Sequence, residues 1–118
     1  MRNYPKTIRK LIRNYMTEAY ERELRRELKK LEVSFTHWQN QEISSGEFSN
    51  RIHLYETGPS KELFKKYNYG EADMNVAYAV ACGILSNDEV PAELLDSLAG
   101  PLGFFESLAA RGELRKPD

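Results

Sequence analysis

Apolar residues recur at helical spacing over almost the first forty positions of the chain. From Ile8 to Trp38 they fall three or four residues apart, which is the pattern of one face of an α-helix. Placed at about 100° per residue, the stripe over 8–19 and the stripe over 24–38 are centred more than about 90° apart. We therefore expect one long helix or two abutting ones, with a bend near Tyr20 as an alternative, and two halves that face different partners.

Local signals predict the next helix boundaries. Ser44 and Glu47 have the spacing of a capping box, so a helix should begin at Ser44. The dipeptide Gly58-Pro59 is typical of a helix end, because glycine favours the C-terminal position and proline cannot continue the hydrogen bonding. A short helix over 60–70, capped by its first serine, should follow.

Small side chains distinguish the segment 71–85. Alanine and glycine are frequent there, so a helix formed by this segment is slim and can approach its neighbours closely, which favours the centre of a bundle. Two further helices are expected over 91–100 and 101–111, with Gly112 as the stop. No segment shows the sustained alternation of a β-strand. The predicted fold is all-α, a small helical bundle of about five to six helices with a long N-terminal helix.

Length and composition bound the organisation of the chain. Its 118 residues, 41% apolar and 30% charged, suit one globular domain that folds without a cofactor. We divide it into a basic N-terminal helix or helix pair over 1–40, a compact helical body over 44–111 and a fraying tail over 113–118. Cys82 is the only cysteine, which excludes a disulfide within the chain and a cysteine-based zinc site. Because the sequence has no apolar leader and no membrane span, we expect a cytoplasmic protein.

Charge is divided unevenly along the chain. Residues 1–30 carry ten Lys and Arg against four Glu, a formal charge of +6, whereas residues 31–118 carry seven bases and fourteen acids, a charge of −7. A basic segment of this kind is expected to bind an anionic partner. That partner is either nucleic acid, a membrane surface, a partner protein, or the acidic part of its own or a second copy.

The basic residues form two groups when this segment is projected on a helix. The first group has no acid among its members and lies opposite the apolar stripe over 8–19; it comprises Arg2, Lys6, Arg9, Lys10 and Arg13. The second is diluted by glutamates four residues away, which favours an ordinary solvated face; it comprises Arg22, Arg25, Arg26, Lys29 and Lys30. The first group is therefore our candidate contact for an anion or a partner.

Candidate catalytic chemistry is sparse. The only histidines, His37 and His53, lack the glutamates of a di-iron pattern, and neither has an evident place beside Cys82. A helix-turn-helix over 60–85 would offer a recognition helix with two acids and no Lys or Arg, which argues against DNA reading by that motif. We therefore expect no enzyme, no metal and no cofactor. An active site assembled in space around either histidine is the remaining alternative.

Two tyrosines lie beside the basic groups of the N-terminal helix and bear on its function. Tyr15 and Tyr20 are candidate interface residues because Tyr and Arg are frequent in binding surfaces, although core packing explains them equally. We predict a non-catalytic protein-interaction or regulatory module that self-associates by setting its basic N-terminal helix against the acidic body of a second copy. The alternative is binding of nucleic acid or another anionic surface through the first basic group. We identify no small-molecule ligand and do not expect a membrane surface as the partner.

Overall fold

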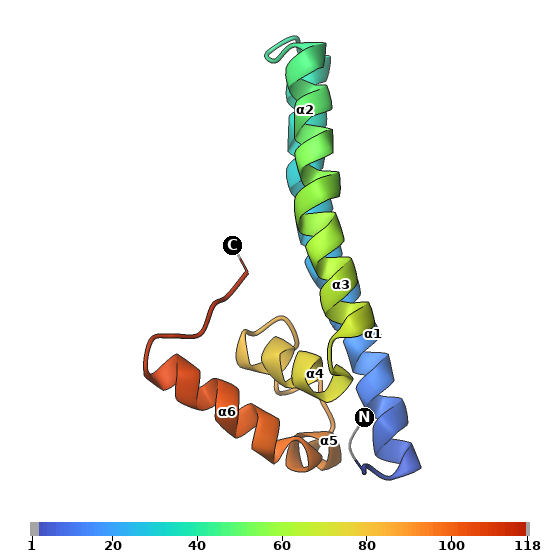
Figure 1. The fold of residues 1–118 in the computed structure, drawn as a ribbon, viewed down its shortest axis with the longest axis vertical. Helices are drawn as coiled ribbons and strands as arrows, with labels where there is room; N and C mark the ends of the chain where they lie inside the picture. Colours follow the sequence, from blue (N-terminus) through green and yellow to red (C-terminus); the bar gives the residue numbers. More distant parts are fainter. Residues whose placement is uncertain (1–2, 118) are drawn as a thin grey trace.

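The structure, a computed structural model, describes residues 3–117. Its elements, in chain order, are α1 (Lys6–Gln39), α2 (Ser45–Tyr55), the π-helical turn η1 (Glu56–Ser60), α3 (Lys61–Tyr69), α4 (Ala72–Ala81), α5 (Ala92–Ser97) and α6 (Ala99–Ala110). Within the described range there is no strand, so the predicted all-α fold with a long N-terminal helix is confirmed (Figure 1).

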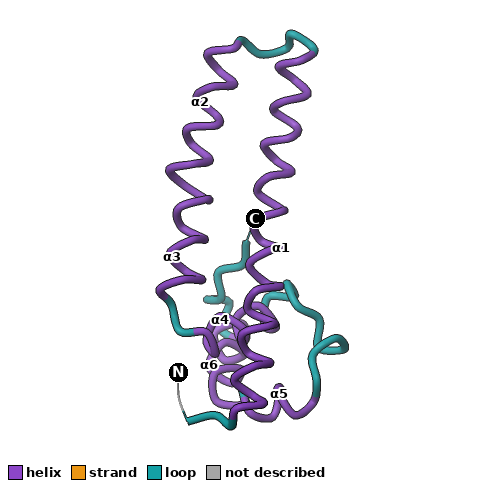
Figure 2. The backbone as a smooth tube through the Cα atoms, turned by 90° about the vertical axis from the view of Figure 1, so that its right-hand side faces the viewer, coloured by secondary structure: helices purple, strands orange, loops and turns teal. Residues whose placement is uncertain are grey.

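A long helical hairpin is the main feature of the fold. α1 runs without interruption from Lys6 to Gln39, and α2, η1 and α3 return alongside it in the opposite direction (Figures 1 and 2). The capping box begins α2 as predicted, because Ser44 Oγ accepts the backbone N–H of Glu47 at 3.0 Å. We call residues 24–60, the part of the hairpin that extends beyond the core, the arm.

The predicted helix end at Gly58-Pro59 was wrong. η1 continues the winding through both residues, and Ser60 is itself helical, with φ −59° and ψ −49°, and makes no side-chain cap. A proline ring inside an α-helix clashes with the carbonyl four residues before it. The wider π turn relieves this clash and needs no hydrogen bond from the proline nitrogen. α2, η1 and α3 therefore form one continuous rod against α1.

α4 lies at the centre of the core, as its small side chains predicted. Val76, Ala77 and Ala79 of α4 are fully buried, and Ile12 and Ala19 from the first half of α1 join the same cluster. The second half of α1 packs differently, since the Trp38 ring stacks on Phe48 of α2, with 5.6 Å between centroids. The two halves of α1 thus face different elements, as their rotated stripes indicated.

Residues 45–60 contribute nothing to the core cluster, which joins the first half of α1 to residues between Tyr67 and Leu102. The arm therefore carries them away from the compact part of the molecule, which is smaller than the body over 44–111 that we expected (Figure 1). Among the described residues, no helix combines the length and the apolar character needed to cross a membrane.

The C-terminal third differs from expectation in two details. Leu98 separates α5 from α6, so the break expected at Gly100 comes earlier, and Pro101 lies near the start of α6, where a missing N–H breaks no helical hydrogen bond. Gly112 ends the last helix with φ +70°, as predicted. Residues 113–117, which we expected to fray, run back towards the hairpin and contact α4 and α1 (Figure 1).

Candidate functional site

The first basic group forms an exposed face on the N-terminal turns of α1. Lys6, Arg9, Lys10 and Arg13 are all exposed, and we call these four the basic face. None of their side chains forms an ion pair or hydrogen bond with any residue from 3 to 117. The opposite side of the same turns is anchored in the core through Ile12, so the helix holds the basic side chains outward. Arg2, the fifth member of the predicted group, lies outside the described residues.

Four of the five residues of the second basic group make side-chain contacts within the described part of the chain, and Lys29 makes none there. Arg22 makes the most of them: its Nη1 and Nη2 donate to the Glu89 carboxylate at 2.9 and 2.6 Å, and Nη1 also donates to the Ile84 carbonyl at 2.8 Å. The hydrogen bonds from Arg22 are the main cause that lowers the pKa of Glu89 to about 2. Arg25 and Lys30 pair with glutamates of α1 itself. This group therefore serves the fold, as a diluted face predicts.

An acidic surface lies on α5 and the turn before it. Asp88, Glu93 and Asp96 are exposed, and we call these three the acidic surface. Within the described part of the chain, none of their carboxylates has a basic partner. α5 packs against α1, whose buried side faces the core while the basic face is on its other side. The two charged surfaces form no ion pair with each other among residues 3–117.

Tyr15 and Tyr20 both take part in packing within the molecule. The Tyr15 hydroxyl donates to the Glu89 carbonyl at 2.9 Å, and the Tyr20 ring stacks on Tyr67 with 5.0 Å between centroids. Both are partly buried against the core cluster. Both tyrosines therefore take part in core packing, and their part in an interface stays a prediction.

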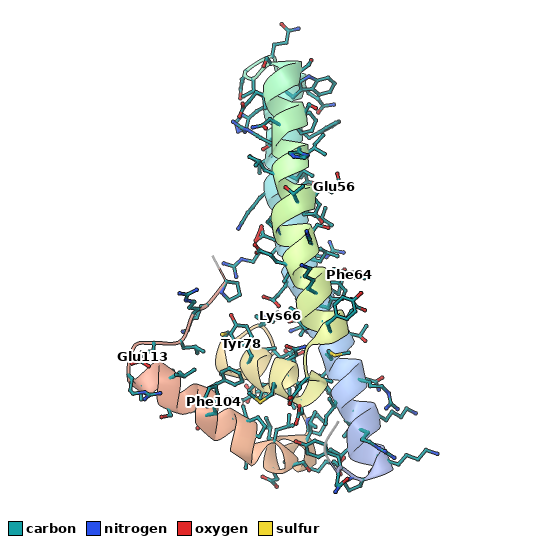
Figure 3. All side chains as sticks on the ribbon, in the orientation of Figure 1. Glu56, Phe64, Lys66, Tyr78, Phe104 and Glu113 are labelled. Carbon is teal, nitrogen blue, oxygen red and sulfur yellow. The ribbon has the colours of Figure 1, made fainter. Side chains whose placement is uncertain are left out.

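A buried polar cluster joins α1, α3 and α4, and sequence reasoning missed it. Glu23 is only 6% exposed; its carboxylate accepts Lys66 Nζ at 3.1 Å and the hydroxyl of Tyr67. The Lys66 ammonium also lies 3.9 Å from the centre of the Tyr78 ring (Figure 3). Burial is the main cause that raises the pKa of Tyr67, and the Glu23 hydrogen bond adds to it. The one available signal was that Glu23 follows Ala19 by four residues and so continues the buried stripe of α1.

Two neighbouring hollows lie against the hairpin, and the tail lines one of them. The lower one, of about 380 Å³, lies between the polar cluster and the tail; it is lined by Glu23, Arg26, Glu27, Pro59, Glu62, Leu63, Lys66, Tyr78, Arg115, Lys116 and Pro117. The upper one, of about 220 Å³, lies between α1 and α2; it is lined by Glu27, Lys30, Leu31, Ser34, Arg51, Leu54, Tyr55 and Pro59. The two hollows share Glu27 and Pro59, so they are neighbours along the hairpin.

The histidines and the cysteine lie apart from one another. His37 contacts the Glu42 carboxylate in the hairpin turn, and His53 is exposed on α2. Cys82 is half-buried at the end of α4, with its sulfur 4.0 Å from the Arg115 carbonyl oxygen. In the described part of the chain, no three His, Cys, Asp or Glu side chains are grouped so as to hold a metal ion. Comparison of the chain with protein-family models, with curated proteins and with solved structures finds no match.

Proposed function

We propose that this protein is a non-catalytic helical interaction module that self-associates by setting the basic face of α1 against the acidic surface of a second copy. The observation that supports the proposal is the pair of exposed, oppositely charged surfaces whose side chains form no ion pair among residues 3–117. In a two-fold dimer each surface is used twice, because the basic face of one copy meets the acidic surface of the other and the reverse.

Electrostatics favours such a pairing. Arg9 and Arg13 are four residues apart on one helix, a spacing at which like charges destabilise the helix by about 0.2–0.5 kcal/mol. Opposing carboxylates would remove that repulsion and steer the two copies together. The helix is held by the core beneath it, so the basic side chains keep their spacing when a partner approaches.

Charge reversal with a matched control tests the proposal. Size-exclusion chromatography with light scattering should show a dimer or larger species at low salt that dissociates at high salt. The variant Arg9→Glu with Arg13→Glu should be monomeric at low salt. The control Lys61→Glu with Lys65→Glu reverses two exposed lysines four residues apart on α3 that also lack partners among residues 3–117, and should behave as the native chain does.

A complementary swap makes the test specific. Reversing Glu93 and Asp96 to lysine should also give a monomer, and combining both reversals in one chain should restore association, because each surface then again meets its opposite. A native protein that keeps its monomer mass across a wide concentration range at low salt would refute self-association.

Nucleic acid is the second candidate partner, favoured by the absence of any acid among the four members of the basic face. Each phosphate contact should add about −0.9 to the slope of log affinity against log salt. Replacing Lys6, Arg9, Lys10 and Arg13 by glutamine should flatten that slope, whereas the α3 control should leave it unchanged. A raised ratio of absorbance at 260 and 280 nm in the eluting peak, lost at high salt, would place this candidate first.

A further inference from the structure

The tail forms one wall of the lower hollow and is held there through its main chain. The Tyr78 hydroxyl donates to the Arg115 carbonyl at 2.6 Å, and Arg26 Nη2 donates to the Pro117 carbonyl at 3.2 Å. Contacts of this kind recognise an extended backbone rather than particular side chains. Another extended segment presenting carbonyls at the same spacing satisfies the same two donors.

The Tyr78 donor is positioned by side chains outside the tail. Lys66 lies over the Tyr78 ring and donates to the buried Glu23 carboxylate, which also accepts the Tyr67 hydroxyl. This cluster holds Tyr78 on the side of the hairpin where the tail runs (Figure 3). A site whose donors are fixed before binding avoids part of the entropic cost of ordering them.

Charge in the lower hollow matches a basic segment. Arg115 and Lys116 of the tail line it together with Glu62, whose carboxylate forms no ion pair within residues 3–117. Glu27 also lines the hollow, although it is paired with Lys30. A segment that carries a basic residue next to the carbonyl bound by Tyr78 is therefore favoured over an acidic one.

Residues 113–117 do not line the upper hollow. From Arg115 to Pro117 the tail passes from α4 to Arg26 of α1, and the next turns of α1 beyond Arg26 line the upper hollow. Leu31, Leu54 and Tyr55 give that hollow an apolar lining, with Leu54 57% exposed. A longer segment that follows the path of the tail reaches apolar surface that the tail does not cover.

We infer that the two hollows form a binding groove for an extended segment of a partner protein, with a basic residue at Tyr78 and large apolar residues following it towards Leu54. Residues 113–117 hold the Tyr78 and Arg26 donors of the lower hollow within the same chain and compete with the partner for them. This inference goes beyond the proposed self-association and does not depend on it, because the groove contains no residue of the basic face.

Two fluorescein-labelled peptides test the inference on the full chain. Both repeat residues 112–117; one continues with three leucines and the other with three serines. Fluorescence anisotropy should show that the leucine peptide binds at least about tenfold more tightly than the serine peptide, because only the leucines bury apolar surface in the upper hollow.

Variants on α2 separate the groove from general stickiness. Leu54→Ser should reduce the affinity of the leucine peptide towards that of the serine peptide. Ile52→Ser, a matched change at a residue that is 41% exposed on the same helix but does not line either hollow, should leave it unchanged. Equal affinity of the two peptides, equal effects of the two variants, or no binding of the leucine peptide would overturn the inference. Unchanged leucine-peptide binding by the charge-reversed basic-face variant would keep this result separate from that of self-association.

Discussion

Removal of the Glu23 carboxylate is the sharpest test of the structure's interior. Glu23 is the buried acceptor that joins Lys66 of α3 and the neighbouring Tyr67 to α1. The variant Glu23→Ala leaves the Tyr67 hydroxyl buried without its acceptor, since Tyr67 is only 4% exposed. It also releases Lys66, whose side chain is 29% exposed and can turn to water.

The loss of stability follows from how far Tyr67 and Lys66 are buried. A buried donor that loses its partner costs about 1–3 kcal/mol. Loss of an ion pair whose lysine reaches solvent adds about 0–1 kcal/mol. We therefore expect Glu23→Ala to lower the free energy of unfolding by about 3 kcal/mol, which corresponds to a fall in Tm of about 10 °C for a chain of this size.

Urea denaturation followed by circular dichroism measures this loss. The control is Glu27→Ala, one turn along α1, which removes a more exposed pair with Lys30 and should cost less than about 0.5 kcal/mol. In a double-mutant cycle, Glu23→Ala and Tyr67→Phe should be coupled by about 1–2 kcal/mol, because both remove the same hydrogen bond. A cost below about 1 kcal/mol for Glu23→Ala, or additive effects in the cycle, would refute the buried cluster.

Three further outcomes follow from particular contacts. Glu89, with its pKa lowered to about 2, contributes stability that is fully present above its ordinary pKa of 4.5 and is lost as the pH falls towards 2; Glu89→Gln should flatten this acid-side decline of Tm. Gly58→Ala should stabilise by about 0.5–1 kcal/mol, since its Cβ meets nothing within 4 Å, whereas Gly70→Ala brings Cβ to 2.4 Å from a backbone carbonyl of α3 and should destabilise; urea midpoints decide both. Tyr78→Phe should speed labelling of the Cys82 thiol by a thiol reagent, because it frees the tail carbonyl that both residues contact, and an unchanged rate would contradict a docked tail.

Periodicity predicted the existence of the helices better than their ends. The rotated stripes of α1 indicated two sets of partners, and the structure shows these as the core and α2. The same pattern could not decide between one helix and two, because no glycine or proline interrupts residues 6–39 and the stripes shift without a break. Continuity there depends on packing along the whole hairpin, which a local pattern does not describe.

Gly58-Pro59 shows how tertiary packing overrides a local rule. Glycine followed by proline ends an isolated helix, because the chain gains nothing by continuing past a lost hydrogen bond. In this fold the rod continues because η1 and α3 pack against α1, and the wider turn removes the steric conflict. The serine after the proline then lies inside a helix and has no free N-terminus to cap.

The candidate sites differ in how well they could be predicted from the sequence. The basic face is local, since its members all lie within residues 6–13 of one helix. The charge pattern alone therefore predicts it. The polar cluster is not, because Glu23 and Lys66 are 43 positions apart and meet only once the hairpin closes. The groove depends further on the tail, whose carbonyls have no side-chain pattern that marks them as bound.

The least buried part of the molecule is also the part that the groove crosses. No residue of α2 is buried, and Leu54 and Ile52 are exposed on it, so α2 is held mainly by its contacts with α1. Elements with few buried contacts open with a low free energy. A segment that binds between α1 and α2 adds apolar contact where the fold has least, and by mass action it stabilises the arm more strongly as its concentration rises above its Kd. Because few side chains of the arm are buried, a partner bound in the groove would add a large share of the arm's apolar contact. The same contacts would stabilise the core around α4 little, because its side chains are already buried.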